Sequence, residues 1–289
     1  MSPSLLTNWL RHYKDLFLVG LLKILAAIAG AIIVLILSFL LKEALPALQE
    51  VGIKAFFTDK TWNPNEKSYN LVPMIWGTAF TTTGAVLLAT PLGIISALFC
   101  QYYAPKAIAS SYRRLIELLA GIPSVVYGFW GLVVLVPLIT RLHPPGTSLL
   151  AGIAILTLMI LPTIALVADA TFAEVPQEYL LGAAAMGLSS WGIIWQILLP
   201  VSKAGLLTGV ILEVGRAIGE TMAVLMVCGN VVQIPDSIFD PVRTLTANIA
   251  LEMAYALDNH RSALFVSGLL LLSVIIFLAI AIELVERKV

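Results

Sequence analysis

The stretch LLAGIAILTLMILPTIALVADATF, which runs from Leu149 to Phe172, determines the fold class of this chain. It contains a single charged residue, Asp169, and it supplies the ~20 predominantly apolar residues that an α-helix needs to cross a bilayer. Hydrocarbon offers no hydrogen-bond partner to a peptide group, so a segment of this kind crosses the membrane as a helix. The sequence therefore predicts an integral membrane protein.

The rest of the chain has the same character. Of its 289 residues, 60% are hydrophobic and only 12% are charged, which leaves too few charges to cover a water-soluble globule. We expect an all-α, polytopic membrane protein with about six transmembrane helices, forming one domain over residues 1–289. The other predicted spans are Leu16–Leu41, Met74–Tyr102, Leu115–Thr140, Gly205–Cys228 and Ala263–Leu284.

Lysine and arginine predict the orientation, because they are enriched in short cytoplasmic loops. Their modest bias favours a multi-pass chain with both termini in the cytoplasm, and the net charge of zero argues against a nucleic-acid partner. The predicted inner side carries Arg11, Lys14, Lys23, Lys106, Arg113, Arg114, Lys203, Arg287 and Lys288. The predicted outer side carries Lys42, Lys54, Lys60, Lys67, Arg141, Arg243 and Arg261.

The first apolar segment has an alternative interpretation as a signal peptide. Arg11 and Lys14 precede it, and Ala27-Ile28-Ala29 offers a small-residue cleavage site. The apolar run continues well beyond that site, which favours a retained helix. The two cysteines, Cys100 and Cys228, fall near opposite ends of their spans, so no disulfide between them is expected.

Two outer loops are predicted to contain short helices. In the loop from Lys42 to Val72, the apolar patch Ile53–Phe57 predicts an interfacial helix followed by turns. In the loop from Gly229 to Ser262, apolar residues of Thr244–Leu257 recur at helical spacing, which predicts a short amphipathic or re-entrant helix. Glu252, within that helix, is expected to be solvated.

The longest inner loop, Ala173–Lys203, has the pattern of a helix, a turn and a second helix. Glu178 suits the first turn of the first helix, and Gly187 can end that helix in a left-handed cap. Ser189 or Ser190 can then cap the second helix. Such a loop either docks on another protein or lies on the lipid headgroups as an ordinary connector.

Charged residues occur at membrane depth on the fifth predicted span. At ~100° per residue, Gly205, Gly209, Glu213, Arg216 and Glu220 fall within roughly 80° of one another. Charges at this depth cost ~2.5 to 3.5 kcal/mol each, so the stripe should face protein or water, with Arg216 near both carboxylates. One interpretation is an ion-pair cluster that fixes subunit packing. The other is a transient anion site, in which a guanidinium binds oxyanion oxygens through paired hydrogen bonds.

Other polar residues lie on the third and fourth spans. Ser124 and Tyr127, beside Pro123, could present hydroxyls to the same polar path. Glu117 and Asp169 lie near the inner ends of these spans. We expect them to contact Arg113, Arg114 or headgroup water and not a substrate. His12, His143 and His260 are predicted to lie at the surface.

The pattern Gly187-x9-Ile197-x-Leu199-Pro200, preceded by an alanine-rich turn, resembles the coupling loop of binding-protein-dependent ABC importer permeases. The resemblance implies a type I importer permease fold with a core at about 70–285 and a coupling loop at about 173–203. By register, the acidic residue of the family's pattern falls at Leu181, and Glu178, one turn earlier, could take part of its role. The coupling residues implied by the resemblance are Glu178, Ala183, Ala184, Gly187, Ile197, Leu199 and Pro200.

Two further stretches, Leu119–Leu132 and Gly215–Met226, look like the corresponding parts of the PstC-type permeases of phosphate-specific importers, and the similarity extends from about Asn70 to Leu284. This resemblance implies a subunit that forms half of a path for inorganic phosphate across the bacterial inner membrane. The implied partners are a second, PstA-like permease, a PstB-like ATPase dimer that holds ATP and magnesium, and an external, PstS-like phosphate-binding protein.

The chain has no Gly-Lys dipeptide and therefore no Walker A phosphate-binding loop, so any ATP must be hydrolysed by a partner. We predict a transport subunit with no catalytic residue, cofactor or metal site of its own. Two alternatives stay open: an ABC permease for another oxyanion, such as molybdate or sulfate, and a secondary transporter driven by an ion gradient. An intramembrane enzyme is disfavoured because no histidine is predicted at membrane depth.

Overall fold

The computed structural model describes the backbone of residues 3–286 and the side chains of residues 18–284. The orientation charges Arg11, Lys14, Arg287 and Lys288, together with His12, lie outside the described side chains. The α-helices are α1 (Pro3–Glu50), α2 (Ala55–Thr58), α3 (Val72–Leu98), α4 (Lys106–Ala120), α5 (Ser124–Trp130), α6 (Val136–Thr140), α7 (Leu149–Ala173), α8 (Gln177–Ala185), α9 (Ser190–Ile193), α10 (Leu199–Val201), α11 (Lys203–Gly219), α12 (Met222–Val227), α13 (Leu245–Glu252) and α14 (Asp258–Glu286).

Short elements of other kinds interrupt or join these helices. Three wide π-helical turns occur within the described residues: η2 (Phe99–Tyr103), η3 (Gly131–Leu135) and η4 (Ile194–Leu198). A 3-10 turn, η1 (Pro64–Glu66), joins two-residue strands β1 (Trp62–Asn63) and β2 (Ser68–Tyr69), which pair antiparallel. This small hairpin stands where the sequence predicted only turns.

Four described helices are long and apolar enough to cross a membrane. They are Leu18–Glu50, Val72–Tyr103, Leu149–Ala173 and Asp258–Leu284. Two bent pairs bring the count to as many as six: Lys106–Ala120 with Ser124–Thr140, and Ser190–Val201 with Lys203–Gly219. The predicted class, an all-α polytopic membrane protein, is confirmed.

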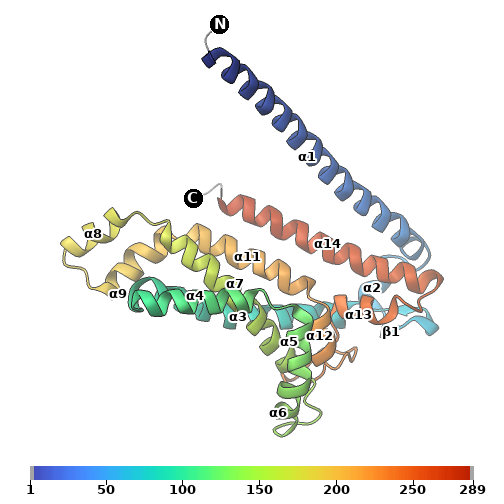
Figure 1. Cartoon of the computed structure of the whole chain (residues 1–289). Coiled ribbons are helices and arrows are strands. Elements are labelled where there is room, and N and C mark those ends of the chain that lie inside the picture. The colour runs from blue at the N-terminus through green and yellow to red at the C-terminus, as the bar shows by residue number, and fades with distance from the viewer. Residues whose placement is uncertain (1–2, 287–289) are drawn as a thin grey trace.

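The third predicted span is not a single straight helix. Its two halves meet at 90°, and the chain between them contains Gly121, Ile122 and Pro123. Proline has no N–H to donate and disfavours a helical conformation at the preceding residue, so α4 ends before it. As a result, α5 and α6 turn away from the direction of the other helices (Figure 1).

The fifth predicted span, Gly205–Cys228, is also interrupted. Helix α11 ends at Gly219, Glu220 has an extended backbone with ψ 131°, and α12 begins at Met222. At its other end, α11 follows the segment Ser190–Val201 at an angle of 67°. The predicted helix was therefore too long at one end.

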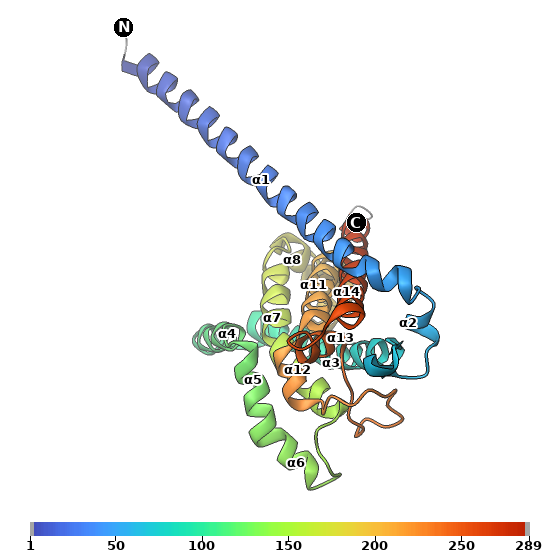
Figure 2. The same ribbon diagram turned by 90° about the vertical axis from the view of Figure 1, so that its right-hand side faces the viewer.

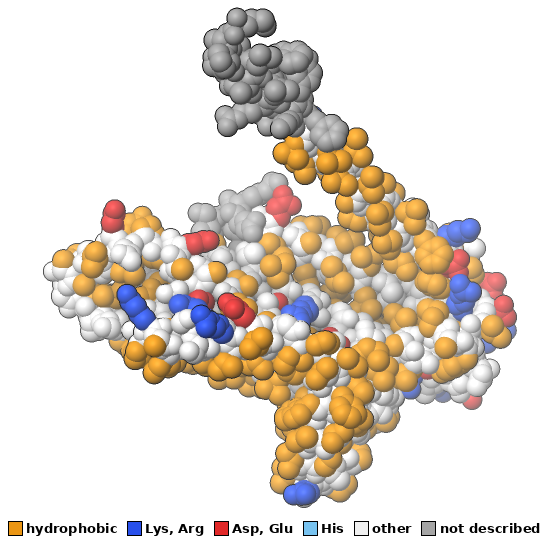
Figure 3. Space-filling model, viewed as in Figure 1, with side chains coloured by type: hydrophobic (Ala, Val, Ile, Leu, Met, Phe, Trp, Pro, Cys, Tyr) orange, Lys and Arg blue, Asp and Glu red, His pale blue; other side chains and the backbone are white. Residues whose placement is uncertain are grey.

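Helices α3, α7, α11 and α14 run beside one another between two ends of the molecule (Figure 1). We call the end that carries α8 and α9 the α8 end, and the end that carries α2, α13 and β1 the α13 end. Helix α1 packs on α14 near the α13 end and then leans away from the body (Figures 1 and 2). Apolar side chains cover the part of α1 whose side chains are described, from Leu18 onward, and the projection formed by α5 and α6, as expected of surfaces that face lipid (Figure 3).

The most extensive contact in the bundle joins α3 and α7, which pack at glycines. A Cβ atom at Gly93 would lie 2.7 Å from Ile164 Cγ2 and 3.1 Å from the Ala165 backbone nitrogen. A Cβ atom at Gly84 would lie 2.6 Å from Ile153 Cδ1. Small residues at these positions allow close approach of the backbones, which is the usual source of stability between helices in lipid.

The two predicted outer loops meet at the α13 end, where both predicted short helices form, as α2 and α13. Phe56, Trp62 and Tyr69 from the first loop share one apolar cluster with Leu245 from the second. Cys100 and Cys228 are both buried and free, so the absence of a disulfide between them is confirmed.

The α3–α7 contact leads to a prediction about stability. Gly93→Ala should destabilise the detergent-solubilised chain by ~1–3 kcal/mol, because an added methyl group overpacks a closed contact. Gly30→Ala in α1 provides the control, since nothing lies within 4 Å of its added Cβ atom. Thermal unfolding should show a lower Tm for Gly93→Ala alone, and equal Tm values for the two variants would contradict the packing argument.

Candidate functional site

The inner loop folds as a short helix, a left-handed turn and a second helix. Gly187 has φ +86°, and the N–H groups of Gly187 and Leu188 donate to the carbonyls of Ala184 and Ala183. These two hydrogen bonds form a Schellman cap, which is a left-handed helix end of the kind that the sequence predicted at Gly187. The Ser189 hydroxyl accepts from the Gly192 N–H at 3.2 Å and caps the next helix.

Helix α8 presents apolar side chains to the outside. Leu181 is 66% exposed and Met186 is 76% exposed, although neither is in a membrane-spanning segment. Glu178, Ala184 and Pro200 are also exposed. An exposed apolar helix face outside the bilayer is typical of a contact surface for another protein.

Not every residue assigned to the coupling loop faces outward. Ala183 is buried at 2% exposure and lies one helical turn after Leu180, which packs on the cluster around Phe172 and Leu198. Ile197 and Leu199 are half-buried. These three side chains hold the loop in place, and the outward surface consists of Glu178, Ala184 and their exposed neighbours.

Arg216 lies on α11 with a partly open guanidinium. Its side chain is 40% exposed, and its Nη1 lies 3.8 Å from Glu213 Oε2 and donates to the Thr163 hydroxyl at 3.0 Å. Glu213 is buried, and its Oε2 has no hydrogen-bond partner among the described residues. The guanidinium is therefore restrained by one distant carboxylate and one hydroxyl, which leaves donors available for an anion.

Glu220 does not pair with Arg216, contrary to the spacing argument. Its Oε1 accepts from the backbone N–H groups of Thr221 at 3.0 Å and Ala223 at 3.1 Å. The reason is the helix break at Gly219, which removes Glu220 from the i,i+4 geometry of α11. The Glu220 carboxylate instead caps the first turn of α12 from the position before the N-cap residue, Thr221.

The two hydroxyls predicted beside Pro123 have different environments. The Tyr127 hydroxyl donates to the Leu119 carbonyl at 2.8 Å and so closes the break between α4 and α5. It also lies within electrostatic range of Arg216, so the two predicted path residues share one region. Ser124 is half-buried at the start of α5.

Two threonines at the site were missed by sequence reasoning. Thr163 binds Arg216, and the Thr246 hydroxyl donates to the Glu220 carbonyl at 2.7 Å, which joins α13 to the break after α11. Thr163 follows Pro162 in a membrane helix, and a proline at such a position was the signal in the sequence that could have drawn attention to Thr163. Nothing local to Thr246 indicated its distant partner.

An ion pair closes the α8 end of the bundle. Arg113 on α4 binds both carboxylate oxygens of Asp169 on α7, at 2.7 and 3.0 Å. The prediction that Asp169 meets a neighbouring arginine is confirmed. Among the described residues, no group of three or more His, Cys, Asp or Glu side chains could hold a metal ion.

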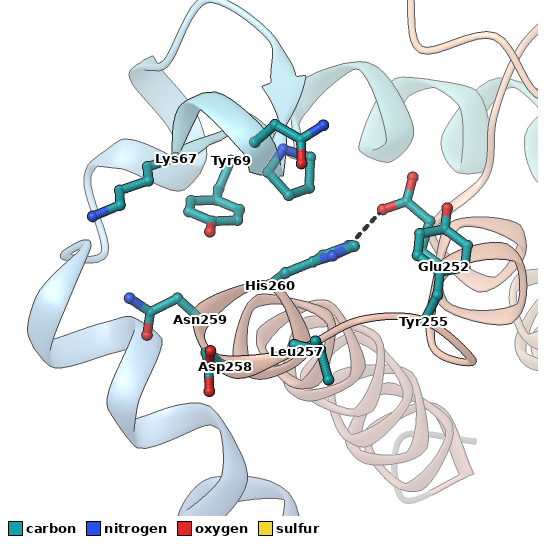
Figure 4. A pocket seen from close by; sticks show the side chains of 10 residues that line it. Lys67, Tyr69, Glu252, Tyr255, Leu257, Asp258, Asn259 and His260 are labelled. Atoms are coloured by element: carbon teal, nitrogen blue, oxygen red, sulfur yellow. Dashed lines mark hydrogen bonds and ion pairs between the residues drawn. The ribbon is translucent and has the colours of Figure 1, made fainter.

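A pocket of about 600 Å³ opens at the α13 end, between the β1–β2 hairpin and the start of α14 (Figure 4). Glu252 forms its polar floor and is buried, whereas the sequence predicted it to be solvated. It is buried because its carboxylate has three close partners: Arg243 at 2.7 Å and His260 at 2.8 Å, both within nine residues of it, and Trp62 at 2.8 Å, from the hairpin 190 residues earlier. His260 is only 15% exposed and is therefore not the surface histidine that was expected.

Comparison with known proteins identifies relatives of most of the chain. Residues 89–289 match the family described as "Binding-protein-dependent transport system inner membrane component". The "Phosphate transport system permease protein PstC" of Mesorhizobium japonicum is 37% identical over 88% of this chain and 85% of its own length. The "Probable ABC transporter permease protein YqgH" of Bacillus subtilis is 41% identical over 75% of this chain and 72% of its own length.

Solved structures show the same fold at low identity. A chain of a bacterial ABC transporter involved in the import of the acidic polysaccharide alginate has a TM-score of 0.68, with 13% identity over 96% of this chain and 99% of its own. A chain of the MetNI methionine ABC transporter in an inward-facing conformation has a TM-score of 0.60, with 18% identity over 75% of this chain and 95% of its own. The fold is that of a type I ABC importer permease.

The two roles considered for Glu220 can be separated by substitution. Glu220→Ala should destabilise the solubilised chain by ~1 kcal/mol through loss of the α12 cap, whereas Glu220→Gln keeps an acceptor oxygen and should stay within a few tenths of wild type. Thermal unfolding measures both variants. Equal destabilisation by the two substitutions would show that Glu220 stabilises the chain through its negative charge and not through the hydrogen bonds that its oxygen accepts.

Proposed function

Because this chain belongs to the family of binding-protein-dependent transport system inner membrane components, we propose that it is a permease subunit of an ATP-driven importer of inorganic phosphate. It forms half of the translocation path and hydrolyses no ATP itself. The observation on this chain that carries the proposal is the open guanidinium of Arg216 on α11. Relatives named as phosphate permeases, which match this chain over 85% and 82% of their own lengths, support the choice of anion.

In this function Arg216 binds the anion transiently. A guanidinium matches two phosphate oxygens with parallel hydrogen bonds and keeps its proton at any physiological pH. Glu213, 3.8 Å away, competes for the same cation when the path is empty, which keeps the anion's stay short. Thr163 supplies a hydroxyl beside the cation, Tyr127 lies within electrostatic range of it, and Glu220 acts indirectly, by capping the helix that follows.

The coupling segment works as a lever. Helix α8 and the left-handed turn at Gly187 dock on a separate ATPase subunit through the exposed face that includes Leu181 and Met186. The segment Ser190–Val201 leads from this turn directly into α11, which carries Arg216. A movement of the docked loop therefore reorients the anion-binding helix.

The orientation follows from this assignment. The α8 end faces the cytoplasm and its ATPase, with both termini inside, and the α13 end faces outwards in the bacterial inner membrane. A second, PstA-like permease completes the path. A PstS-like phosphate-binding protein docks at the α13 end, where the two outer loops form one surface around the pocket floored by Glu252.

Phosphate uptake tests the role of Arg216. In cells that lack the chromosomal copy, Arg216→Ala should lower ATP-dependent uptake of radiolabelled phosphate at least about tenfold, since a hydrogen bond to a charged group contributes about 1.5–3 kcal/mol. Arg216→Lys should also be impaired, because an ammonium cannot make paired hydrogen bonds.

The controls separate the alternative functions. Correct insertion of each variant is verified in membranes, and excess sulfate or molybdate is added as a competitor. Uptake blocked by either competitor would indicate another oxyanion as the substrate. Uptake that persists without ATP while an ion gradient remains would indicate a secondary transporter.

The lever role is tested by Gly187→Asp, which should abolish ATP-coupled uptake and weaken ATPase binding. The matched control for ATPase binding is Gly52→Asp in the loop at the other end of the molecule, because Gly52 has φ +83° and, like Gly187, has nothing within 4 Å of an added Cβ atom. The two substitutions place the same side chain in the same backbone conformation. Normal uptake with an assembled complex in Gly187→Asp would exclude the lever.

A further inference from the structure

An apolar groove of about 670 Å³ lies at the α8 end, apart from the Arg216 site. One wall consists of Ile95, Phe99 and Tyr103, from the end of α3 and η2. The other wall consists of Trp191, Trp195 and Leu199, from the segment Ser190–Val201. None of its lining residues is charged.

Both walls of the groove are built around π-helical turns. Phe99 and Tyr103 belong to η2, and Trp195 belongs to η4. These are two of the three π turns within the described residues. Such turns widen a helix locally and are frequent at functional sites, so their convergence on one groove marks it as a built feature.

The groove lies where protein, hydrocarbon and headgroups meet. Its first wall is the last part of the membrane span Val72–Tyr103, and its second wall is the helix that bends by 67° from α11. Tyr103, Trp191 and Trp195 are all exposed, and aromatic residues with a polar atom collect at this level of a bilayer. The surface that borders the groove is thus the lipid interface of the fold itself.

A second cavity of about 340 Å³ adjoins the groove and shares Tyr103 and Ile194 with it. It adds the hydroxyl-bearing side chains of Tyr102 and Ser190. The two spaces are therefore adjacent: the first is an apolar groove, and the second forms a partly polar end to it. A phospholipid has the same order, with an acyl chain followed by ester and glycerol oxygens.

We propose that this groove binds one acyl chain of a phospholipid from the leaflet at the α8 end, with the ester region beside Tyr102, Tyr103 and Ser190. The bound chain fills the space between α3 and the segment that leads from α8 to α11. It thereby braces the coupling segment against the membrane span. The lipid site depends only on the membrane fold, whereas its effect on coupling rests on the proposed function.

Photolabelling of the complete importer in lipid nanodiscs tests the site. The probe is phosphatidylglycerol with a diazirine on its acyl chain, and labelled peptides are mapped by mass spectrometry. Residues 91–103 and 191–199 should be labelled about tenfold more than the exposed apolar face of α14 around Phe277.

A groove-filling variant and a matched control make the test specific. Ile95→Trp places a large ring in the groove and should lower labelling of both walls about tenfold. Leu88→Trp carries the same ring on an exposed position of α3 that does not line the groove, and should leave the labelling unchanged. With Ile95→Trp, we also expect a changed ratio of ATP hydrolysed to phosphate imported.

Two outcomes would overturn the proposal. Labelling of the walls equal to that of α14, or unaffected by Ile95→Trp, would mean that only bulk lipid is present. A disulfide between Trp195→Cys and a cysteine on the second permease would mean that a protein helix fills the groove. Photolabelling requires no transported substrate, so a failure of the phosphate assignment would be seen separately.

Discussion

Every peptide group that leaves a helix at membrane depth must find another hydrogen-bond partner, and the fold depends on how its helix breaks meet this demand. The break before α5 is closed by the Tyr127 hydroxyl, which binds the Leu119 carbonyl. The break after α11 is closed twice, by the Glu220 carboxylate on the α12 N–H groups and by Thr246 on the Glu220 carbonyl. Side chains therefore satisfy the backbone groups at both of these helix breaks.

The same demand shapes the proposed anion site. Because Glu220 is used at the break, Arg216 keeps only Glu213 as a nearby carboxylate within the described residues, at a distance of 3.8 Å. A guanidinium held between two close carboxylates would be neutralised and would bind an anion poorly. The break in α11 thus preserves positive charge on a helix that faces protein and solvent.

The sequence contains enough information for the spans, because length and hydropathy are local properties. It also contains the Gly187 cap, since glycine favours a left-handed backbone at a helix end. The break at Gly219 was not predictable in this way: it contains no proline and is held by Thr246 from a later helix. Glu252 was misjudged for a similar reason, because its partner Trp62 lies 190 residues away. Contacts between residues far apart in the sequence determine the environment of such positions, and the periodicity of the sequence carries no information about those contacts.

The carboxylate of Glu252 has a mechanical consequence. It joins the hairpin through Trp62, the preceding loop through Arg243 and the start of α14 through His260, while its own backbone belongs to α13. Four segments that could otherwise shift separately are thereby tied into one rigid body. Since Thr246 on α13 is bonded to the Glu220 carbonyl, these tied segments also connect directly to the helix break that follows Arg216.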